Sequence, residues 1–224
     1  MRIFKKILIA LVVLIVALAI AGYFVLRGDP ATLPFDDVTG TDPTLAEPDP
    51  QTIPTVKIAK PVGWKAGEMP EAAQGLQVTR FAEGLEHPRV IYTLPNGDVL
   101  VALSNAPARI VAGGGITNFV AGILFSQAGA ATPSPNKLVL LRDADGDGVA
   151  ELKQELRGDL DSPSGMAFHD GKLYVANHDE VVAFDYQLGA TQLTGTPTKL
   201  MDLPAAGNHW MRNISLKPDG TKLY

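Results

Sequence analysis

One pattern, two alternating segments joined by a tight glycine turn, occurs three times in this chain. The copies span residues 90–103, 165–177 and 213–224, and each turns at a glycine that follows Asn or Asp. Alternating apolar and polar residues around such a turn are among the strongest short-range signals for a β-hairpin. Because helical periodicity is nearly absent after residue 75, the pattern predicts a chain built from repeated antiparallel sheets.

The spacing of the hairpins indicates the size of the repeat. The turn glycines lie about 75 and about 50 residues apart, and the shorter interval is close to one four-stranded blade of a β-propeller. The longer interval contains a Gly/Ala-rich insertion at 113–136. Its apolar middle, residues 119–125, predicts either a short helix packed on the sheet, or a lid or second membrane contact. Four further strands are expected at 137–141, 151–156, 180–186 and 198–202.

We therefore expect an all-β fold over residues 76–224, consisting of about two blades of a β-propeller and the opening hairpin of a third. Two blades cannot close a ring, and a sheet that stops there leaves open edges. The expectation is that these residues form the N-terminal portion of a propeller domain whose remaining blades follow Tyr224.

Residues 7–26 predict a transmembrane helix, because twenty uncharged, mostly apolar residues in a helix cover about 30 Å, the thickness of the bilayer hydrocarbon. Three basic residues precede this segment and one follows it. That bias places the N-terminus in the cytoplasm and the rest of the chain on the periplasmic or extracellular side. A cleaved signal peptide ending at Ala19-Ile-Ala21 is the alternative. We favour residues 1–27 as a single-pass anchor in the inner (cytoplasmic) membrane.

Residues 28–75 are rich in Pro, Asp and Thr and have no sustained apolar period. Such a composition cannot bury enough surface to offset its ordering entropy, so a spacer between membrane and propeller is expected. For residues 55–59 the alternative is an edge strand of the folded domain.

Composition narrows the classes of function. The formal net charge is −5, and basic residues do not cluster beyond the N-terminus, so no nucleic-acid partner is expected. The chain has no cysteine. Disulfides, thiol catalysis and Cys-His zinc sites are therefore excluded.

Three polar loops precede the first strands of the predicted hairpins, at 86–89, 161–165 and 207–213. In a propeller such loops converge at one mouth of the central channel, where their side chains face a common ligand. His209 is the candidate general base, since imidazole takes up a proton near neutral pH. The alternative is that His209 only caps its loop.

His209 lies nine residues before Pro218 in the third hairpin. With this spacing, residues 76–224 resemble the glucose/sorbosone dehydrogenase family, six-bladed β-propeller oxidoreductases that use pyrroloquinoline quinone. The resemblance implies that His209 removes the proton of a sugar hydroxyl while hydride passes to the quinone. Soluble glucose dehydrogenases have Asp before this His. Asn208 here points instead to the sorbosone-type branch and makes glucose a doubtful substrate.

Two arginines in the predicted loops are candidates for holding the quinone. The planar guanidinium of Arg212 suits bidentate pairing with a quinone carboxylate, and a salt bridge at a strand end is the alternative. Arg89 can act in the same way with His87 beside it. For Arg89 and His87, solvated charges in an X-Pro turn are the favoured interpretation.

The segment Asp143-Ala-Asp-Gly-Asp-Gly148 predicts a calcium-binding turn. Alternate carboxylates with glycines at the bend suit Ca²⁺, which takes six to eight oxygen ligands. An EF-hand is rejected because Gln154 replaces its final Glu and strands flank the turn; an Asp/Gly-rich turn without an ion is the alternative. Any such ion is expected to be structural, because the turn lies within a blade and away from the entry loops. The catalytic Ca²⁺ implied by the resemblance would use residues beyond Tyr224. The candidate ligands are Asp143, Asp145, Asp147 and Glu151.

Two other histidines, His169 and His178, lie beside turns of the second predicted blade without a third ligand at a recognisable spacing. We interpret both as solvated turn residues.

The leading hypothesis is a membrane-anchored quinoprotein that oxidises a sugar or sugar-derived aldehyde, with pyrroloquinoline quinone and Ca²⁺ as cofactors. A respiratory-chain electron acceptor is a further candidate partner. Two alternatives remain, a non-catalytic propeller that binds a glycan or protein and a calcium-dependent lactonase-like hydrolase. The activity is expected of the full-length protein, and residues 1–224 alone are expected to be inactive.

Overall fold

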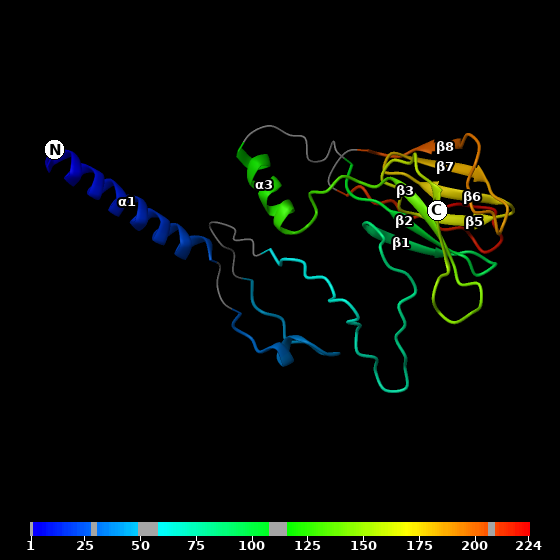
Figure 1. Cartoon of the computed structure of the whole chain (residues 1–224), viewed down its shortest axis with the longest axis horizontal. Coiled ribbons are helices and arrows are strands. Elements are labelled where there is room, and N and C mark those ends of the chain that lie inside the picture. The colour runs from blue at the N-terminus through cyan, green and yellow to red at the C-terminus, as the bar shows by residue number, and fades with distance from the viewer. Residues whose placement is uncertain (1, 28–30, 49–57, 108–115, 206–208) are drawn as a thin grey trace. The chain divides into compact units, whose positions relative to one another are not determined.

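The computed structural model of the chain describes all residues except 1, 28–30, 49–57, 108–115 and 206–208. The chain forms two compact units, Met1–Ala59 and Lys60–Tyr224. The first contains helix α1 (Arg2–Leu26) and the 3-10 helix η1 (Phe35–Val38), and the second contains helix α3 (Ile116–Gln127) and the strands (Figure 1). The strands are β1 (Pro88–Thr93), β2 (Val99–Leu103), β3 (Lys137–Arg142), β4 (Leu152–Arg157), β5 (Met166–His169), β6 (Lys172–Ala176), β7 (Glu180–Asp185) and β8 (Thr198–Asp202).

Helix α1 has the properties that the sequence predicts for a membrane span. Its segment Ile3–Val25 contains 23 residues, has a mean hydropathy of 3.0 and buries none of its side chains within the protein. A helix of this length and composition can cross the hydrocarbon core of a bilayer. A signal sequence has the same properties, so the choice between anchor and signal peptide stays a prediction.

The expected spacer has little regular structure in its described part, where η1 is followed by turns and irregular chain as far as Thr79. This agrees with its lack of an apolar period. The alternative edge strand at 55–59 falls mainly on residues 55–57, which lie outside the described residues, and the next two residues are irregular.

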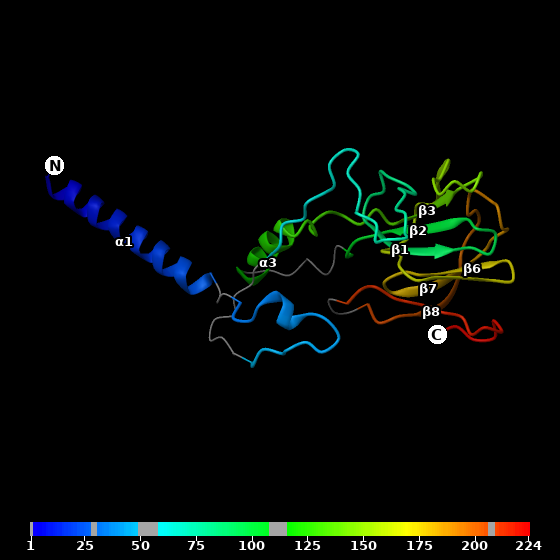
Figure 2. The ribbon, with the colours of Figure 1, turned by 90° about the horizontal axis from the view of Figure 1, so that it is seen from below.

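The second unit contains two four-stranded antiparallel sheets with the simplest possible topology. Their strand orders are β1-β2-β3-β4 and β5-β6-β7-β8, so each sheet is a meander in which sequence neighbours pair (Figures 1 and 2). The predicted hairpins at 90–103 and 165–177 and the four further strands are confirmed. The four-stranded unit predicted from the glycine spacing is therefore present twice, whereas closure into a propeller ring stays a prediction.

Successive side chains of β2 and β3 point to opposite faces of the first sheet. Because nearly all of them are apolar, both faces of the sheet carry apolar side chains. Leu100 pairs with Leu140, and Ala102 pairs with Leu138. These side chains pack against the second sheet in one core. Figure 2 shows the two sheets as two layers. Because burying one leucine contributes roughly 2 kcal/mol, this core is the main source of stability. From the second sheet it receives Leu173, Val175, Val182 and Phe184, among others.

The opposite face of the first sheet is covered by chain from its own unit. Val101 and Val139 face this side and pack with Phe81 and Leu85, which precede β1. Residues 76–81 form no strand, and Phe81 at their end contributes to this cover.

A direct polar bond fixes the first strands of the two sheets side by side. The backbone N–H of Phe168 in β5 donates to the Tyr92 hydroxyl of β1 at 2.9 Å. Because Phe168 and Tyr92 also border the shared core, the bond joins the sheets where they pack. The two sheets are therefore neighbours, and their identity as propeller blades stays a prediction.

The third predicted hairpin forms, but as an isolated turn. Leu216 and Leu223 make a single antiparallel bridge, and Ser215 and Tyr224 exchange two backbone hydrogen bonds of 2.9 and 2.8 Å. Gly220 adopts φ of 68° at the turn, a backbone conformation that glycine takes without strain.

The insertion between β2 and β3 contains α3, so the helical alternative is confirmed for its apolar middle. The packing expected for that helix is not, because Phe119, Ile123 and Phe125 are exposed. A helix with apolar residues on several sides cannot bury all of them against one sheet.

A buried ion pair links a turn of the first sheet to the second sheet. Asp98, only 2% exposed, accepts two hydrogen bonds from Arg142 at 2.6 and 2.7 Å. Arg142 also donates to the carbonyl of Gly189 in the β7–β8 connection at 3.0 Å. The Arg142 hydrogen bond holds the pKa of Asp98 below its usual value, although burial of the carboxyl acts to raise it.

Replacing Arg142 by methionine is expected to lower the free energy of unfolding by about 2 kcal/mol at neutral pH, because a buried carboxylate loses its charged partner. Since the pKa of Asp98 is depressed in the folded state, the pair stabilises fully above the unfolded carboxyl pKa of about 3.9 and progressively less as pH falls below it. Urea denaturation of both proteins at neutral pH and about pH 3 should show the difference shrinking in acid.

Lys172→Met serves as the matched control, because Lys172 and Asp185 form an exposed pair at 2.7 Å. Its effect should stay within about 0.5 kcal/mol at either pH. A difference for Arg142→Met that is equally small at neutral pH would contradict the assigned role.

Candidate functional site

The candidate site lies at one end of the two sheets. Because the strands of a meander alternate in direction, consecutive connections fall at opposite ends of each sheet. The Asp-rich turn at 143–151 lies at one end of the first sheet. We call the other end of the two sheets the polar end. It is formed by the described parts of 86–89, 104–136, 158–165, 177–179 and 203–213. All three loops that the sequence singled out belong to the polar end.

The second and third of these loops are joined by three hydrogen bonds to the backbone of Arg212. The hydroxyl of buried Ser164 accepts the N–H of Arg212 at 2.8 Å and donates to its carbonyl at 2.9 Å. The N–H of Gly165 donates to the same carbonyl at 2.8 Å. The space is tight, since a Cβ on Gly165 would lie 2.5 Å from the Arg212 carbonyl oxygen and 2.7 Å from the Ile214 nitrogen. Glycine at 165 is therefore what allows this close approach.

The guanidinium of Arg212 holds its own loop together. It donates to the carbonyls of His178 at 3.2 Å and His209 at 2.8 Å, and also to that of Pro204. The alternative predicted from sequence, a salt bridge at a strand end, does not describe these contacts, because all three acceptors are backbone carbonyls. Among the described residues, Arg212 thus positions the chain on either side of His209.

Arg89 joins the first loop to the third. Its guanidinium donates to the carbonyl of Ser104 at 3.1 Å and to the side chain of Asn105 at 3.0 Å. The guanidinium carbon lies 5.7 Å from the centre of the Trp210 ring, within the range of a cation–π contact. Arg89 is exposed, as predicted, but its charge is engaged instead of merely solvated. His87 beside it contacts the Thr132 hydroxyl, so it is not simply solvated either.

The candidate base, His209, is exposed on the same loop. Its neighbours Gly207 and Asn208 lie outside the described residues. Trp210 on its other side is half-buried beside Arg89, and the carbonyl of His209 itself is bound by Arg212. The loop that carries His209 therefore contacts both of the other loops, while the role of the imidazole as a base stays a prediction.

The Asp-rich turn brings its four candidate ligands together. One oxygen atom from each of Asp143, Asp145, Asp147 and Glu151 lies within 4.8 Å of the others. The Asp143 carboxylate accepts two turn amides at 2.7 and 2.9 Å, and Glu151 accepts the Ala144 amide at 2.6 Å. The carboxylates thus fold inward and close the turn. Calcium binding there stays a prediction.

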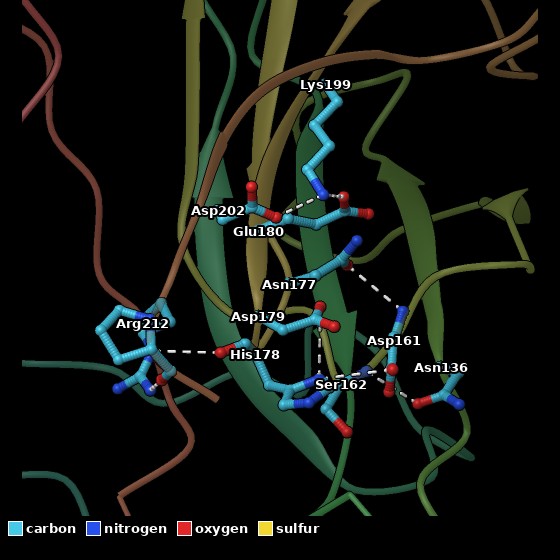
Figure 3. Close-up of polar contacts among 11 residues, drawn as sticks. Asn136, Asp161, Ser162, Asn177, His178, Asp179, Glu180, Lys199, Asp202 and Arg212 are labelled. Carbon is cyan, nitrogen blue, oxygen red and sulfur yellow. Dashed lines mark hydrogen bonds and ion pairs between the residues drawn. The ribbon is translucent and has the colours of Figure 1, made fainter. Parts of the chain in front are cut away.

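His178 was predicted to be a solvated turn residue, and this prediction is wrong. The residue is only 1% exposed. Its Nδ1 lies 3.4 Å from Asp161 Oδ2 and 3.6 Å from Asp179 Oδ1, and Figure 3 shows both carboxylates directed at the ring. Turns between strands are usually solvated, which is why the position of His178 favoured exposure. The available signal was that residues 173–176 and 181–184 on either side are continuously apolar, which is typical of strands buried on both faces. The exposure of His169 agrees with its prediction.

A cavity of about 700 Å³ opens at the polar end beside this histidine. Its walls come from the described ends of the β2–β3 insertion and from the two segments that carry Asp161 and Asp179. The hydroxyl of Ser162 is buried and has no hydrogen-bond partner among the described residues. The lining residues are Ala106, Pro107, Ala130, Ala131, Thr132, Pro133, Ser134, Asn136, Asp161, Ser162 and Asp179.

Comparison with known proteins finds only distant structural similarity. No protein-family model and no curated protein matches the sequence. One similar solved structure is the holo form of the pyranose dehydrogenase PQQ domain from Coprinopsis cinerea, at 16% identity and a TM-score of 0.49, covering 66% of this chain and 29% of that one. Another is the iodide structure of Trichoderma reesei Carbohydrate-Active Enzymes Family AA12, at 18% and 0.49, covering 69% and 33%. The chain spans about a third of their length, and similarity at this level assigns neither family nor activity.

Gly165→Ala is expected to release the 209–214 segment from β5, because the added Cβ would meet backbone atoms that cannot move aside. Limited proteolysis should then cut this segment at least about tenfold faster, since cleavage tracks local opening. Gly63→Ala is the control, because a Cβ there meets nothing within 4 Å. Equal cleavage of the Gly165→Ala protein and the wild type would contradict the docking.

Proposed function

We propose that the chain belongs to a membrane-anchored quinoprotein oxidoreductase that oxidises a sugar or sugar-derived aldehyde. The observation that carries the proposal is the meeting of the three predicted loops, through Arg89 with Trp210 and Ser164 with Arg212. The sequence predicts that these three loops face one common ligand. Their convergence supports a shared site at the polar end.

The side chains at this site fit a planar, anionic quinone. Pyrroloquinoline quinone is a flat ring system that carries carboxylates. The Trp210 ring offers an aromatic surface, and the guanidinium groups of Arg89 and Arg212 offer cationic donors. Arg212 uses three of its five N–H groups on the carbonyls described above, which leaves two for a carboxylate. When bound, the quinone would accept the hydride, which carries the two electrons of the oxidation.

The protein's own part in the reaction is to hold the substrate hydroxyl and remove its proton. A ring nitrogen of His209 takes that proton in the proposed mechanism, as a general base. Arg212 contributes indirectly, because its hydrogen bond to the His209 carbonyl fixes the backbone that carries the imidazole. Asn208 in place of Asp favours a sorbosone-type substrate over glucose, as the family resemblance implies.

The proposed setting is the outer side of the cytoplasmic membrane, with α1 as the anchor and a respiratory-chain component as the electron acceptor. The charge bias around α1 supports this orientation. In the proposal a propeller ring is completed by chain beyond Tyr224, which would also hold the catalytic calcium.

His209→Gln is expected to lower the rate of the full-length protein by about 100-fold or more, because general-base catalysis contributes that much. The assay follows reduction of an artificial dye by an aldose or aldosone after addition of pyrroloquinoline quinone and Ca²⁺. Quinone binding, measured separately by quenching of tryptophan fluorescence, should survive the substitution. His169→Gln is the matched control, since His169 is exposed at the opposite end of β5.

An unchanged rate in His209→Gln would remove His209 as the base. A full-length protein that reduces no dye but opens lactones without quinone would show the hydrolase alternative to be correct. A protein that does neither and binds a glycan would be a recognition module.

We also propose a structural calcium ion in the Asp-rich turn. Four inward-facing carboxylates without an ion repel one another, and a hard divalent cation offsets this repulsion. Millimolar Ca²⁺ should raise the midpoint of thermal unfolding by a few degrees in the wild type and not in Asp145→Asn. An identical response in the two proteins would contradict the site.

A further inference from the structure

We propose that Asp161, His178 and Asp179 form a binding site for a divalent transition-metal ion, with Zn²⁺ as the representative. The site lies on the wall of the cavity at the polar end. It is separate from the Asp-rich turn and does not depend on the proposed quinone chemistry.

The spacing of the three ligand atoms fits such an ion. Nδ1 of His178 lies 3.4 Å from Asp161 Oδ2 and 3.6 Å from Asp179 Oδ1. All three atoms lie within 4.8 Å of one another. Two ligands of a tetrahedral Zn²⁺, each about 2.1 Å from the metal, are about 3.4 Å apart. The carboxylates thus converge on the imidazole, as Figure 3 shows, at nearly the separation that one shared ion requires.

The ligand types select the class of metal. One imidazole nitrogen with two carboxylate oxygens is typical of Zn²⁺ and neighbouring transition metals, whereas Ca²⁺ and Mg²⁺ prefer oxygen ligands alone. The all-oxygen Asp-rich turn therefore differs from this site in chemistry as well as in position.

Burial and charge favour a cation at this point. His178 is buried, while the side chains of Asp161 and Asp179 are 51% and 37% exposed. Both carboxylates line the cavity, and none of the described residues lining it is basic. A metal ion can thus enter from the cavity and meet two negative charges before it reaches the imidazole. Its arrival replaces carboxylate repulsion by attraction.

The cavity leaves room for a fourth ligand. Three protein ligands with an open position are the pattern of zinc sites that bind water or a small molecule. Ser162 lines the same cavity, and its buried hydroxyl has no hydrogen-bond partner in the described part of the chain. Water or a small anion from the cavity would fill the open position of the metal.

The backbone around the ligands is already fixed. The His178 N–H donates to the Asp161 carbonyl at 3.1 Å, and the Asp161 N–H donates to the Asn177 side chain at 3.3 Å. Arg212 binds the His178 carbonyl from the other side at 3.2 Å. Little ordering remains for an ion to impose, which favours affinity.

The test uses the full chain in detergent after removal of metals with a chelator. Zn²⁺ titration by calorimetry should detect one tight ion per chain, and Co²⁺ should give the intense visible absorption of a tetrahedral site. Asp161→Asn and Asp179→Asn should each weaken binding by about tenfold or more, since even the loss of an outer-shell partner costs 10–100-fold. Both carboxylates are partly exposed, so these variants keep the fold, which circular dichroism verifies.

Asp143→Asn makes the same chemical change in the Asp-rich turn and should leave Zn²⁺ affinity unchanged. Zn²⁺ should also raise the thermal midpoint of the wild type but not of Asp161→Asn or Asp179→Asn. The proposal is overturned if the wild type binds no Zn²⁺, if both variants bind it as tightly as the wild type, or if Asp143→Asn is the variant that loses it.

Discussion

The apolar core shared by the two sheets is the interaction on which the rest of the structure depends. Leu100, Leu138 and Leu140 on one sheet meet Leu173 and Phe184 on the other. Their positions follow from two-residue alternation along paired strands, so a slip of one residue would replace this set by the valines and leucines of the opposite face, which pack against different neighbours. The core therefore fixes the register of both sheets together. No disulfide contributes, because the chain has no cysteine.

A fixed register determines where the polar loops lie. Each meander directs alternate connections to the same end, and the packed sheets bring the ends of both meanders together. At the polar end, loops from distant parts of the sequence then bond through Ser164, Arg212 and Arg89. The contacts are mostly between side chains and backbone, which explains how irregular chain holds a defined shape there. The same contacts position both the proposed base and the proposed metal ligands.

Most of the fold was predictable from the sequence because its signals are local. Asn-Gly and Asp-Gly turns and alternating residues determine hairpins within about ten residues. For His178 the local signal of burial was the pair of apolar strands on either side of its turn, whereas its contact with Asp161 in another loop leaves no mark in the local sequence. The backbone carbonyls that bind Arg89 and Arg212 were missed for a related reason. Every residue carries a carbonyl, so such an acceptor cannot be recognised from the residue type. Likewise, the apolar composition of 119–125 predicted a helix but not its exposure.

Hydrogen exchange at two amides measures the central claim, that the loop carrying His209 is held against the first strand of the second sheet. The Arg212 amide donates to Ser164, and the Gly165 amide donates to Arg212. The account predicts that both exchange as slowly as the amides that pair β5 with β6, because they open only when that sheet opens. Exchange of both at the rate of an unstructured peptide would show that the loop is not docked, and the convergent site would be lost with it.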